Sequence, residues 1–111
     1  MDRQQLGKFG ETIAENYLKE NGYQILCRNF RCRAGEIDIV ASKGHVLHFI
    51  EVKTRQGSLF GHPSESITSK KKSHMKAAAG NYLAKMRGSA ETYRQIQLDV
   101  ISLEIEHIQG I

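Results

Sequence analysis

The segment GEIDIVASKGHVLHFIEVKTR, residues 35–55, decides the fold of this chain. Residues 36–42 alternate apolar side chains with polar or small ones, which is typical of a β-strand with one buried face. Residues 46–54 form a longer and mostly apolar strand, and the Ser-Lys-Gly-His sequence between the two strands is typical of a turn. We therefore predict an antiparallel hairpin at the centre of the fold.

The length of the turn sets which polar side chains meet across this hairpin. With a four-residue loop over residues 42–45, the expected opposite pairs are Ala41 with Val46, Glu36 with Glu51, and Asp38 with Phe49. Since side chains two residues apart on a strand share a face, one face would carry four polar groups: Glu36, Asp38, Glu51 and Lys53. Asp38 and Glu51 would be diagonal neighbours, with Cα atoms roughly 7–8 Å apart and carboxylates near enough to share a cation.

This set of residues has two interpretations. Carboxylate oxygens are hard ligands that favour Mg²⁺ or Mn²⁺ over zinc, and a lysine beside them can orient an attacking water and neutralise charge on a phosphate. The first interpretation is therefore a metal-dependent site for phosphodiester hydrolysis. The second is a solvent-exposed hairpin face with alternating charges, and the residue types alone leave both open.

The segments around the hairpin predict one α/β domain over residues 1–111. Apolar residues at helical spacing and β-prone runs predict two helices and two more strands, over residues 4–21, 69–86, 23–30 and 96–108. Gly22 would end the first helix, and Thr68 or Ser69 would cap the second. The order is α-β-β-β-α-β, a mixed β-sheet with helices packed on its faces, and residues 56–66 form a loop.

Composition narrows the functional classes. The chain has 111 residues, of which 40% are hydrophobic and 25% charged, and this excludes a disordered or low-complexity chain. Its two cysteines are too few for a disulfide framework or a cysteine zinc site. No apolar run is long enough for a signal peptide or a membrane span. We expect a reduced, cytoplasmic protein that does not associate with membranes.

The basic residues are unevenly distributed along a chain of net charge +4. Residues 66–90 contain six basic residues and no acidic one, and three arginines lie just before the hairpin: Arg28, Arg31 and Arg33. Three lysines at the start of the second predicted helix are unfavourable for the helix dipole, which favours contact with phosphates over a purely structural role. Two cationic zones on either side of an acidic centre suit a site that holds both phosphates and metal ions.

Asp38, followed thirteen residues later by Glu51-Val52-Lys53, resembles the PD-(D/E)xK nuclease motif, although Ile37 stands where the name of the motif has proline. The wider chain resembles the YraN-like family, which is similar to archaeal Holliday junction resolvases. The matching segments are GETIAENYL, the hairpin, FGHPSESI, the lysine-led helix that ends in GNYL, and QLDVISLE. The resemblance implies a restriction endonuclease-like three-layer core.

The resemblance also implies roles for individual residues. Asp38 and Glu51 would bind Mg²⁺ or Mn²⁺ with help from the carbonyl of Val52, and Lys53 would assist hydrolysis. Glu11 matches the acidic residue of the family's first helix, and it borders the apolar stripe that faces the sheet. Secondary candidates are Glu15, which lies one turn later and further toward solvent, Glu36, and Gln97, which stands where an arginine is common in the family.

The sequence therefore predicts a Mg²⁺- or Mn²⁺-dependent DNA endonuclease, with branched or structured DNA favoured by the resolvase resemblance. The residues expected to contact DNA are Arg28, Arg31, Arg33, Arg55, Lys70, Lys71 and Lys72, of which Lys71 matches the family's lysine. The alternative is a non-catalytic DNA-binding module or adaptor in recombination, repair or DNA uptake. The short chain, which has no specificity domain, indicates a homodimer or a protein partner.

Overall fold

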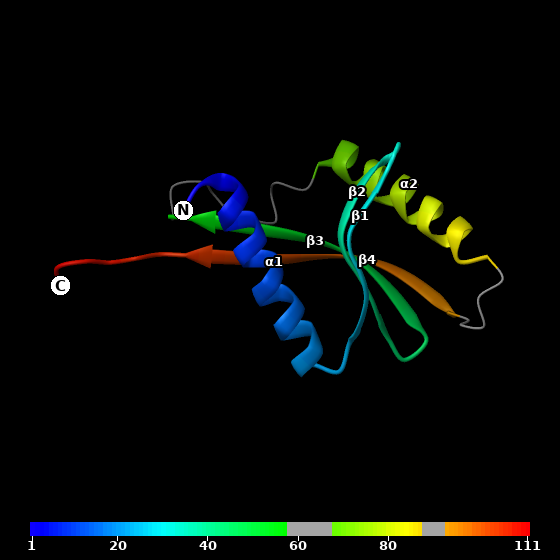
Figure 1. Ribbon diagram of the computed structural model, residues 1–111, viewed down its shortest axis with the longest axis horizontal. Helices are drawn as coiled ribbons and strands as arrows, with labels where there is room; N and C mark the ends of the chain where they lie inside the picture. The colour runs from blue at the N-terminus through cyan, green and yellow to red at the C-terminus, as the bar shows by residue number, and fades with distance from the viewer. Residues whose placement is uncertain (58–67, 88–92) are drawn as a thin grey trace.

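A computed structural model describes residues 1–57, 68–87 and 93–111 of the chain. Its elements, in chain order, are α1 (Arg3–Glu20), β1 (Gln24–Cys32), β2 (Gly35–Lys43), β3 (Val46–Gln56), α2 (Ser69–Lys85) and β4 (Gln95–Ile105). The strands form one sheet in the order β1-β2-β3-β4 (Figure 1). The first three strands are antiparallel neighbours and β4 runs parallel to β3, so the predicted α-β-β-β-α-β order and the mixed sheet are confirmed.

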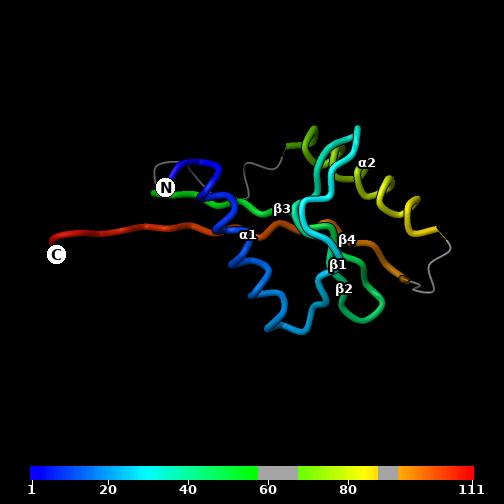
Figure 2. Tube along the Cα trace, viewed as in Figure 1, coloured from blue at the N-terminus to red at the C-terminus, as the bar shows by residue number. Residues whose placement is uncertain are grey.

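The sheet is covered by one helix on each face, which gives three layers (Figure 2). Against α2 the sheet buries a cluster that consists of Phe30, Ile37, Val40, Leu47, Phe49, Met75, Ala78 and Ala79. Against α1 it buries a second cluster that consists of Ala14, Leu18, Ile39, Ala41 and Ile50. Because β2 and β3 contribute to both clusters, these strands need apolar residues on both faces, which explains the mostly apolar run of β3.

The hairpin between β2 and β3 has a tighter turn than the sequence predicts. Lys43 pairs with Val46, so only Gly44 and His45 lie between the strands. The positive φ of Gly44, 60°, suits a two-residue turn, whose twist matches that of the flanking strands. The predicted four-residue loop is therefore wrong.

The tighter turn shifts the pairing across the hairpin by two residues. Val40 lies opposite Phe49 and Ile39 lies opposite Ile50, so the expected pairs of Asp38 with Phe49 and of Glu36 with Glu51 are not formed. Since a shift of two residues keeps every side chain on its face, the shift preserves the buried faces of both strands. Continued by one residue, this register brings Asp38 level with Glu51.

The regular alternation of β2 breaks at Asp38. Ile37 and Ile39, two residues apart, pack into the clusters on opposite faces of the sheet, whereas a regular strand would place them on the same face. On β1, the pairs that flank this position leave Asn29 opposite Asp38, and Asn29 has a φ of 54°. Both strands are thus distorted at the same level, and Asp38 has no regular pairing partner on β1 or β3.

Local signals place the ends of the helices. Asp2 caps α1 in a capping box with Gln5. The helix ends at Glu20 with Asn21 as its C-cap, and Gly22, where the sequence predicts the end of the helix, follows this cap with a φ of 85°. Thr68 caps α2 by accepting a hydrogen bond from the backbone N–H of Lys71. The last strand ends at residue 105 rather than 108. The predicted loop over residues 56–66 lies, apart from its first two residues, outside the described residues.

Gly10 lets α1 lie directly against β3. It is buried, and a Cβ atom at this position would lie 1.7 Å from Thr54 Oγ1 and 2.9 Å from Thr54 Cβ. Any side chain at Gly10 would therefore push the helix away from the strand. Because Glu11 follows Gly10, the close contact also sets how near this carboxylate comes to the sheet.

We predict that Gly10→Ala lowers the free energy of unfolding by about 1–3 kcal/mol, because the overlap with Thr54 outweighs the higher helix propensity of alanine. Gly7→Ala is the matched control, since a Cβ there meets nothing within 4 Å, and it should be neutral or stabilise by up to about 1 kcal/mol. Urea denaturation of both variants measures the difference. Equal stability of the two variants would show that the contact between α1 and β3 is loose.

Candidate active site

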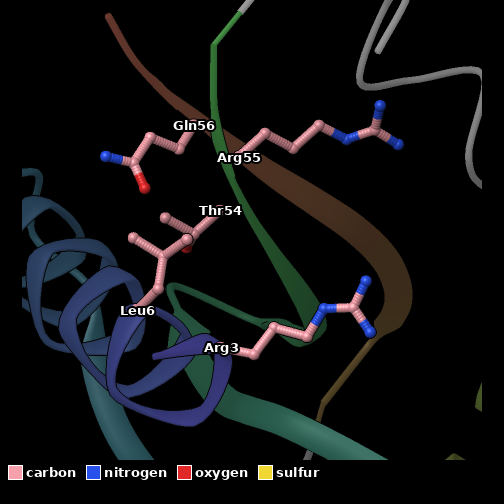
Figure 3. Close-up of a pocket in the computed structure, with 5 residues that line it drawn as sticks. All are labelled: Arg3, Leu6, Thr54, Arg55 and Gln56. Carbon is pink, nitrogen blue, oxygen red and sulfur yellow. The ribbon is translucent and has the colours of Figure 1, made fainter. Parts of the chain in front are cut away.

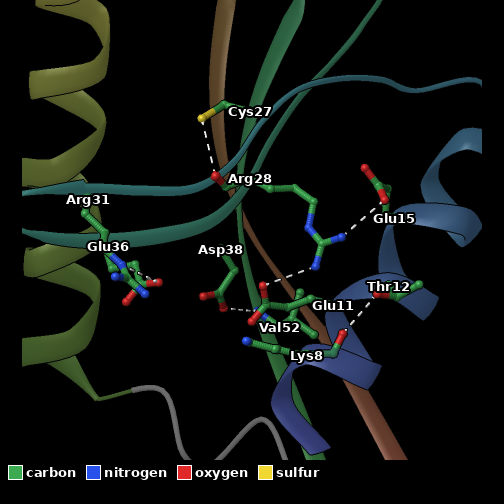
Figure 4. A network of polar contacts seen from close by, with 10 residues as sticks. All are labelled: Lys8, Glu11, Thr12, Glu15, Cys27, Arg28, Arg31, Glu36, Asp38 and Val52. Carbon is green, nitrogen blue, oxygen red and sulfur yellow. Dashed lines mark hydrogen bonds and ion pairs between the residues drawn. The ribbon is translucent and has the colours of Figure 1, made fainter. Parts of the chain in front are cut away.

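Asp38 is held by the backbone of the neighbouring strand. Its Oδ2 atom accepts a hydrogen bond of 2.7 Å from the backbone N–H of Val52 (Figure 4). The regular backbone pairing of β2 with β3 ends at Ile39 and Ile50. Beyond this point the carboxylate of Asp38, instead of a backbone carbonyl of β2, accepts the hydrogen bond from β3. Since the N–H and C=O groups of one residue point to the same edge of a strand, the carbonyl of Val52 is directed to the same side as Asp38.

The surroundings of Asp38 disfavour its negative charge. Burial raises the pKa of this carboxyl from 3.8 to about 6, although the hydrogen bond from Val52 acts in the opposite direction. The neighbouring carboxylates of Glu51, Glu11 and Glu36 contribute to this rise. Four acidic side chains therefore interact electrostatically around one point, at which a cation would relieve the repulsion.

Glu51 is buried beside two ammonium groups. Only 4% of the residue is exposed, and its Oε1 atom lies 3.4 Å from Lys53 Nζ and 3.2 Å from Lys71 Nζ. Lys53 is on the same face of β3, two residues further along, whereas Lys71 reaches across from the first turn of α2. The two lysines offset the charge that Glu51 would otherwise carry alone in the interior.

The acidic residues of α1 share one arginine of β1. Arg28 Nη2 lies 3.5 Å from Glu11 Oε1, and Arg28 Nη1 lies 3.4 Å from Glu15 Oε2 (Figure 4). Glu15 also lies 3.9 Å from Lys19 Nζ, one turn further along the helix. Of the two glutamates, Glu11 is the one that acts on Asp38, and its Oε1 atom is buried without a hydrogen-bond partner among the described residues.

Two surface clefts lie beside these groups and share Arg3. A cleft of about 260 Å³ is lined by Arg3, Gln4, Gly7, Lys8, Glu11, Asn29, Arg31 and Glu36. A larger one of about 420 Å³ lies at the end of β3 and is lined by Arg3, Leu6, Thr54, Arg55 and Gln56 (Figure 3). Arg31 pairs with Glu36 at 3.5 Å. We call the four carboxylates of Asp38, Glu51, Glu11 and Glu36 the acidic centre. Surface clefts that carry cationic side chains lie beside it.

The structure places most of the other predicted residues at the surface. Lys70, Lys72 and Arg33 are exposed on the surface, and nothing in the sequence indicated that Lys71 would instead contact Glu51. Gln97 pairs in register with His48 and donates a hydrogen bond of 2.8 Å to Asp99. It is five residues along the sheet from the level of Lys53, roughly 16 Å at about 3.3 Å per residue, so it is not part of the acidic centre.

Comparison with known proteins identifies the family. A family profile described as "Uncharacterised protein family UPF0102" matches residues 10–103. The chain is 45% identical over 94 residues to a UPF0102 protein of Caldicellulosiruptor saccharolyticus, covering 85% of this chain and 80% of the relative. It is 43% identical over 97 residues to one from Clostridium tetani, covering 87% and 80% respectively. The chain belongs to the UPF0102 family.

The family match contains the whole acidic centre. Residues 10–103 include Glu11, Asp38, the Glu51-Val52-Lys53 segment and Lys71. A UPF0102 protein of Syntrophomonas wolfei is 41% identical over 102 residues, covering 92% of this chain and 86% of that protein.

Of the two helices in the part of the chain that the structure describes, neither is long and apolar enough to cross a membrane.

One polar pair of this UPF0102 chain has no signal in the sequence. His48, which is 6% exposed, lies with its Nδ1 atom 2.6 Å from Asp99 Oδ2, and the edge of Tyr23 packs against its ring. The two partners are 51 residues apart and meet only because β4 lies in register beside β3. The pair is at the end of the sheet away from Lys53, so it stabilises the β3–β4 contact rather than the acidic centre.

We predict that Asp38→Asn stabilises the metal-free protein at pH 7 by about 1–2 kcal/mol, less than the full shift implies because the carboxyl is partly solvated. The native pKa of Asp38 lies above its unfolded value, so the ionised form destabilises the fold above pH 6, and this penalty disappears as the pH falls toward 4. Urea denaturation in a chelator at pH 7 and pH 4.5 measures both effects.

The control for this prediction is Glu36→Gln, since Glu36 is more exposed and pairs with Arg31 at the surface. It should change the unfolding free energy by less than about 0.5 kcal/mol at either pH. A wild-type protein as stable as Asp38→Asn at pH 7 would mean that the buried charge of Asp38 does not destabilise the fold.

Proposed function

We propose that this UPF0102 protein is a metal-dependent DNA endonuclease, with branched or structured DNA as the favoured substrate. The observation that carries the proposal is the convergence of Asp38, Glu51 and the backbone of Val52, with Lys53 beside them. A solvent-exposed charged hairpin would not bury Glu51 or raise the pKa of Asp38. Substrate class and membership of the PD-(D/E)xK nucleases rest on the resemblance of the sequence.

The residues at this centre fit a magnesium or manganese ion. Asp38 and Glu51 offer carboxylate oxygens, and Val52 directs its carbonyl to the same side. Within residues 1–57, 68–87 and 93–111, no three His, Cys, Asp or Glu side chains form a ready-made metal cage. Mg²⁺ is usually held by one or two carboxylates together with water and substrate phosphate, so two protein carboxylates are sufficient. The ion would supply Lewis-acid stabilisation of charge on the phosphate.

The lysines and acidic residues around the ion would have separate tasks. Lys53 lies beside Glu51 and is partly exposed, so its ammonium group can hold the attacking water and stabilise charge that develops on the phosphate. Lys71 pairs with Glu51 from α2 and would hold this carboxylate in position. Glu11, fixed by Arg28, would hold water at the open side of Asp38. Asp38 itself accepts from Val52, which fixes the direction of its carboxylate.

The surface around the centre suits a nucleic-acid backbone. The cations that would contact phosphates are the exposed Lys70, Lys72, Arg31, Arg33 and Arg3, and the half-buried Arg55. Arg28 and Lys71, which the sequence assigned to DNA, have carboxylate partners inside the protein and would contribute to positioning instead. Phosphate contacts of this kind give affinity without strong sequence preference.

The first test is cleavage of linear, nicked, flapped and four-way DNA with Mg²⁺ or Mn²⁺. We predict that the wild type cuts at least one of these substrates and that a chelator abolishes cleavage. Lys53→Ala should lower turnover at least about 100-fold while DNA affinity changes less than about threefold, because the ammonium group acts mainly in the transition state. Asp38→Asn should abolish cleavage and should also lose the stabilisation that Mn²⁺ gives to the wild type.

The matched control is Lys19→Ala, which removes an exposed lysine from the far end of α1 and should leave cleavage unchanged. If the wild type binds DNA but cuts none of the structures with either metal, the nuclease proposal fails and a non-catalytic DNA-binding module replaces it. Binding that is equally weak for all variants and insensitive to salt would exclude both.

DNA binding itself should depend steeply on salt. We predict that the double variant Lys70→Gln/Lys72→Gln reduces the slope of log affinity against log salt by about 2, because each lost phosphate contact removes about one released counterion. Lys19→Gln, on α1, should leave the slope as in the wild type. Fluorescence anisotropy with a labelled duplex over a salt series gives all three slopes, and an unchanged slope in the double variant would remove α2 from the DNA surface.

A further inference from the structure

The strand β4 is poorly covered on both faces. The helix α1 packs mainly on β3 and β1, and α2 packs on β2 and β1, so neither helix packs closely on β4. Ile96 is 48% exposed and Val100 is 38% exposed, although both are large apolar residues. The sheet order makes β4 an edge strand, and no described strand pairs with its outer edge. This strand therefore exposes both apolar side chains and backbone hydrogen-bonding groups.

The other edge of the same sheet provides an internal comparison. The strand β1 carries a bulge between Ile25 and Cys27, a positive φ at Asn29, and the exposed cation of Arg31. These are features by which proteins prevent strand pairing at an edge. The sequence of β4, QIQLDVISLEI, has no proline, lysine or arginine, and its pairing with β3 is regular over all eleven residues. Only one of the two edges is protected.

Apolar residues of α1 are also exposed beside β4, on the face of the sheet opposite to Ile96 and Val100. Phe9, Ile13 and Tyr17 lie one turn apart along the helix, and they are 43%, 36% and 55% exposed. A groove of about 390 Å³ runs between α1 and β4, lined by Ile13, Ala14 and Tyr17 and by residues 100–103. A strand added beside β4 would lie along this groove and would cover the exposed side chains of α1.

We propose that the outer edge of β4 pairs with the β4 edge of a second copy of this chain, antiparallel and about a two-fold axis. The geometry points to a closed dimer with one continuous eight-stranded sheet, because a two-fold axis pairs the same edge from both copies and leaves only the protected β1 edges free. The proposal does not depend on nuclease activity, since Asp38, Glu51 and Lys53 lie on β2 and β3.

The charges of β4 permit this self-pairing. In a register centred on Val100, Asp99 faces Ile101 of the second copy and Glu104 faces its Ile96, so no like charges lie directly opposite one another. The same register places the apolar Ile101 of the second copy on the face where Tyr17 is exposed. A register centred on Asp99 would instead oppose two carboxylates and is excluded for that reason.

The test is the molar mass of the full chain in solution, measured by sedimentation equilibrium from low to high micromolar concentration. The wild type should approach twice the monomer mass of 12.5 kDa. Val100→Lys places a charge at the centre of the proposed interface and should raise the dissociation constant at least about tenfold. Ile108→Lys is the matched control, because Ile108 is also apolar and exposed at 64% but follows the end of β4, and it should dimerise as the wild type does.

A second measurement keeps the proposal falsifiable if Val100→Lys does not fold. Amide hydrogen exchange of the wild type should show protection in β4 that rises with protein concentration, while the amides of β1 show no such dependence. A wild-type mass of 12.5 kDa at every concentration, a Val100→Lys variant that dimerises as tightly as the wild type, or open-ended polymers would each overturn the two-fold β4 interface.

Discussion

The rest of the structure depends on β3, which is hydrogen-bonded along both edges and packed against both helices. It pairs with β2 on one side and with β4 over eleven residues on the other, and its side chains enter both apolar clusters. Because neighbours contact both edges and both faces of β3, the strand cannot shift without breaking hydrogen bonds or apolar contacts. Glu51 and Lys53 follow Ile50 on this strand, so two residues of the candidate site lie on the most constrained of the described elements.

The acidic centre forms where β2 stops pairing with β3 while β4 continues to pair with it. The pairing with β2 stops at Ile50, but the pairing with β4 continues to Gln56. The backbone of Val52 is therefore exposed on one side only, and Asp38 occupies that side. The distortion at Asn29 and Asp38, with a positive φ and reversed alternation, is the local strain that accompanies this arrangement.

We expect the carboxylates of the acidic centre to lower the stability of the metal-free protein, and two of the same carboxylates are the proposed metal ligands. Burial, together with the carboxylates of three neighbouring glutamates, raises the pKa of Asp38 to about 6. Arg28, Lys53 and Lys71, from three different elements, offset part of the repulsion between the carboxylates. A bound cation would relieve the remaining repulsion, and an amide in place of one carboxylate would relieve it without a cation, at the cost of a proposed metal ligand. The unprotected edge of β4 has the same character, since a partner would relieve a feature that is unfavourable in the isolated chain.

The sequence by itself determined the order of the elements, the end of the first helix near Gly22, the start of the second near Thr68, and the residues of the Asp38 and Glu51-Val52-Lys53 motif. These follow from periodicity, turn residues and local hydrogen bonds, which act over a few residues. It predicted the turn of the hairpin wrongly, because a four-residue and a two-residue turn over Ser-Lys-Gly-His bury the same faces of both strands, and periodicity therefore does not distinguish the two registers.

Only the tertiary structure decided which side chains meet across elements. The contacts of Lys71 with Glu51, of Arg28 with two glutamates of α1, and of His48 with Asp99 join residues from 13 to 51 positions apart. No local pattern encodes them, because each depends on how a helix or strand is placed against β3. The same holds for the exposed apolar row of α1, whose helical spacing predicts burial but whose position beside β4 leaves Phe9, Ile13 and Tyr17 uncovered.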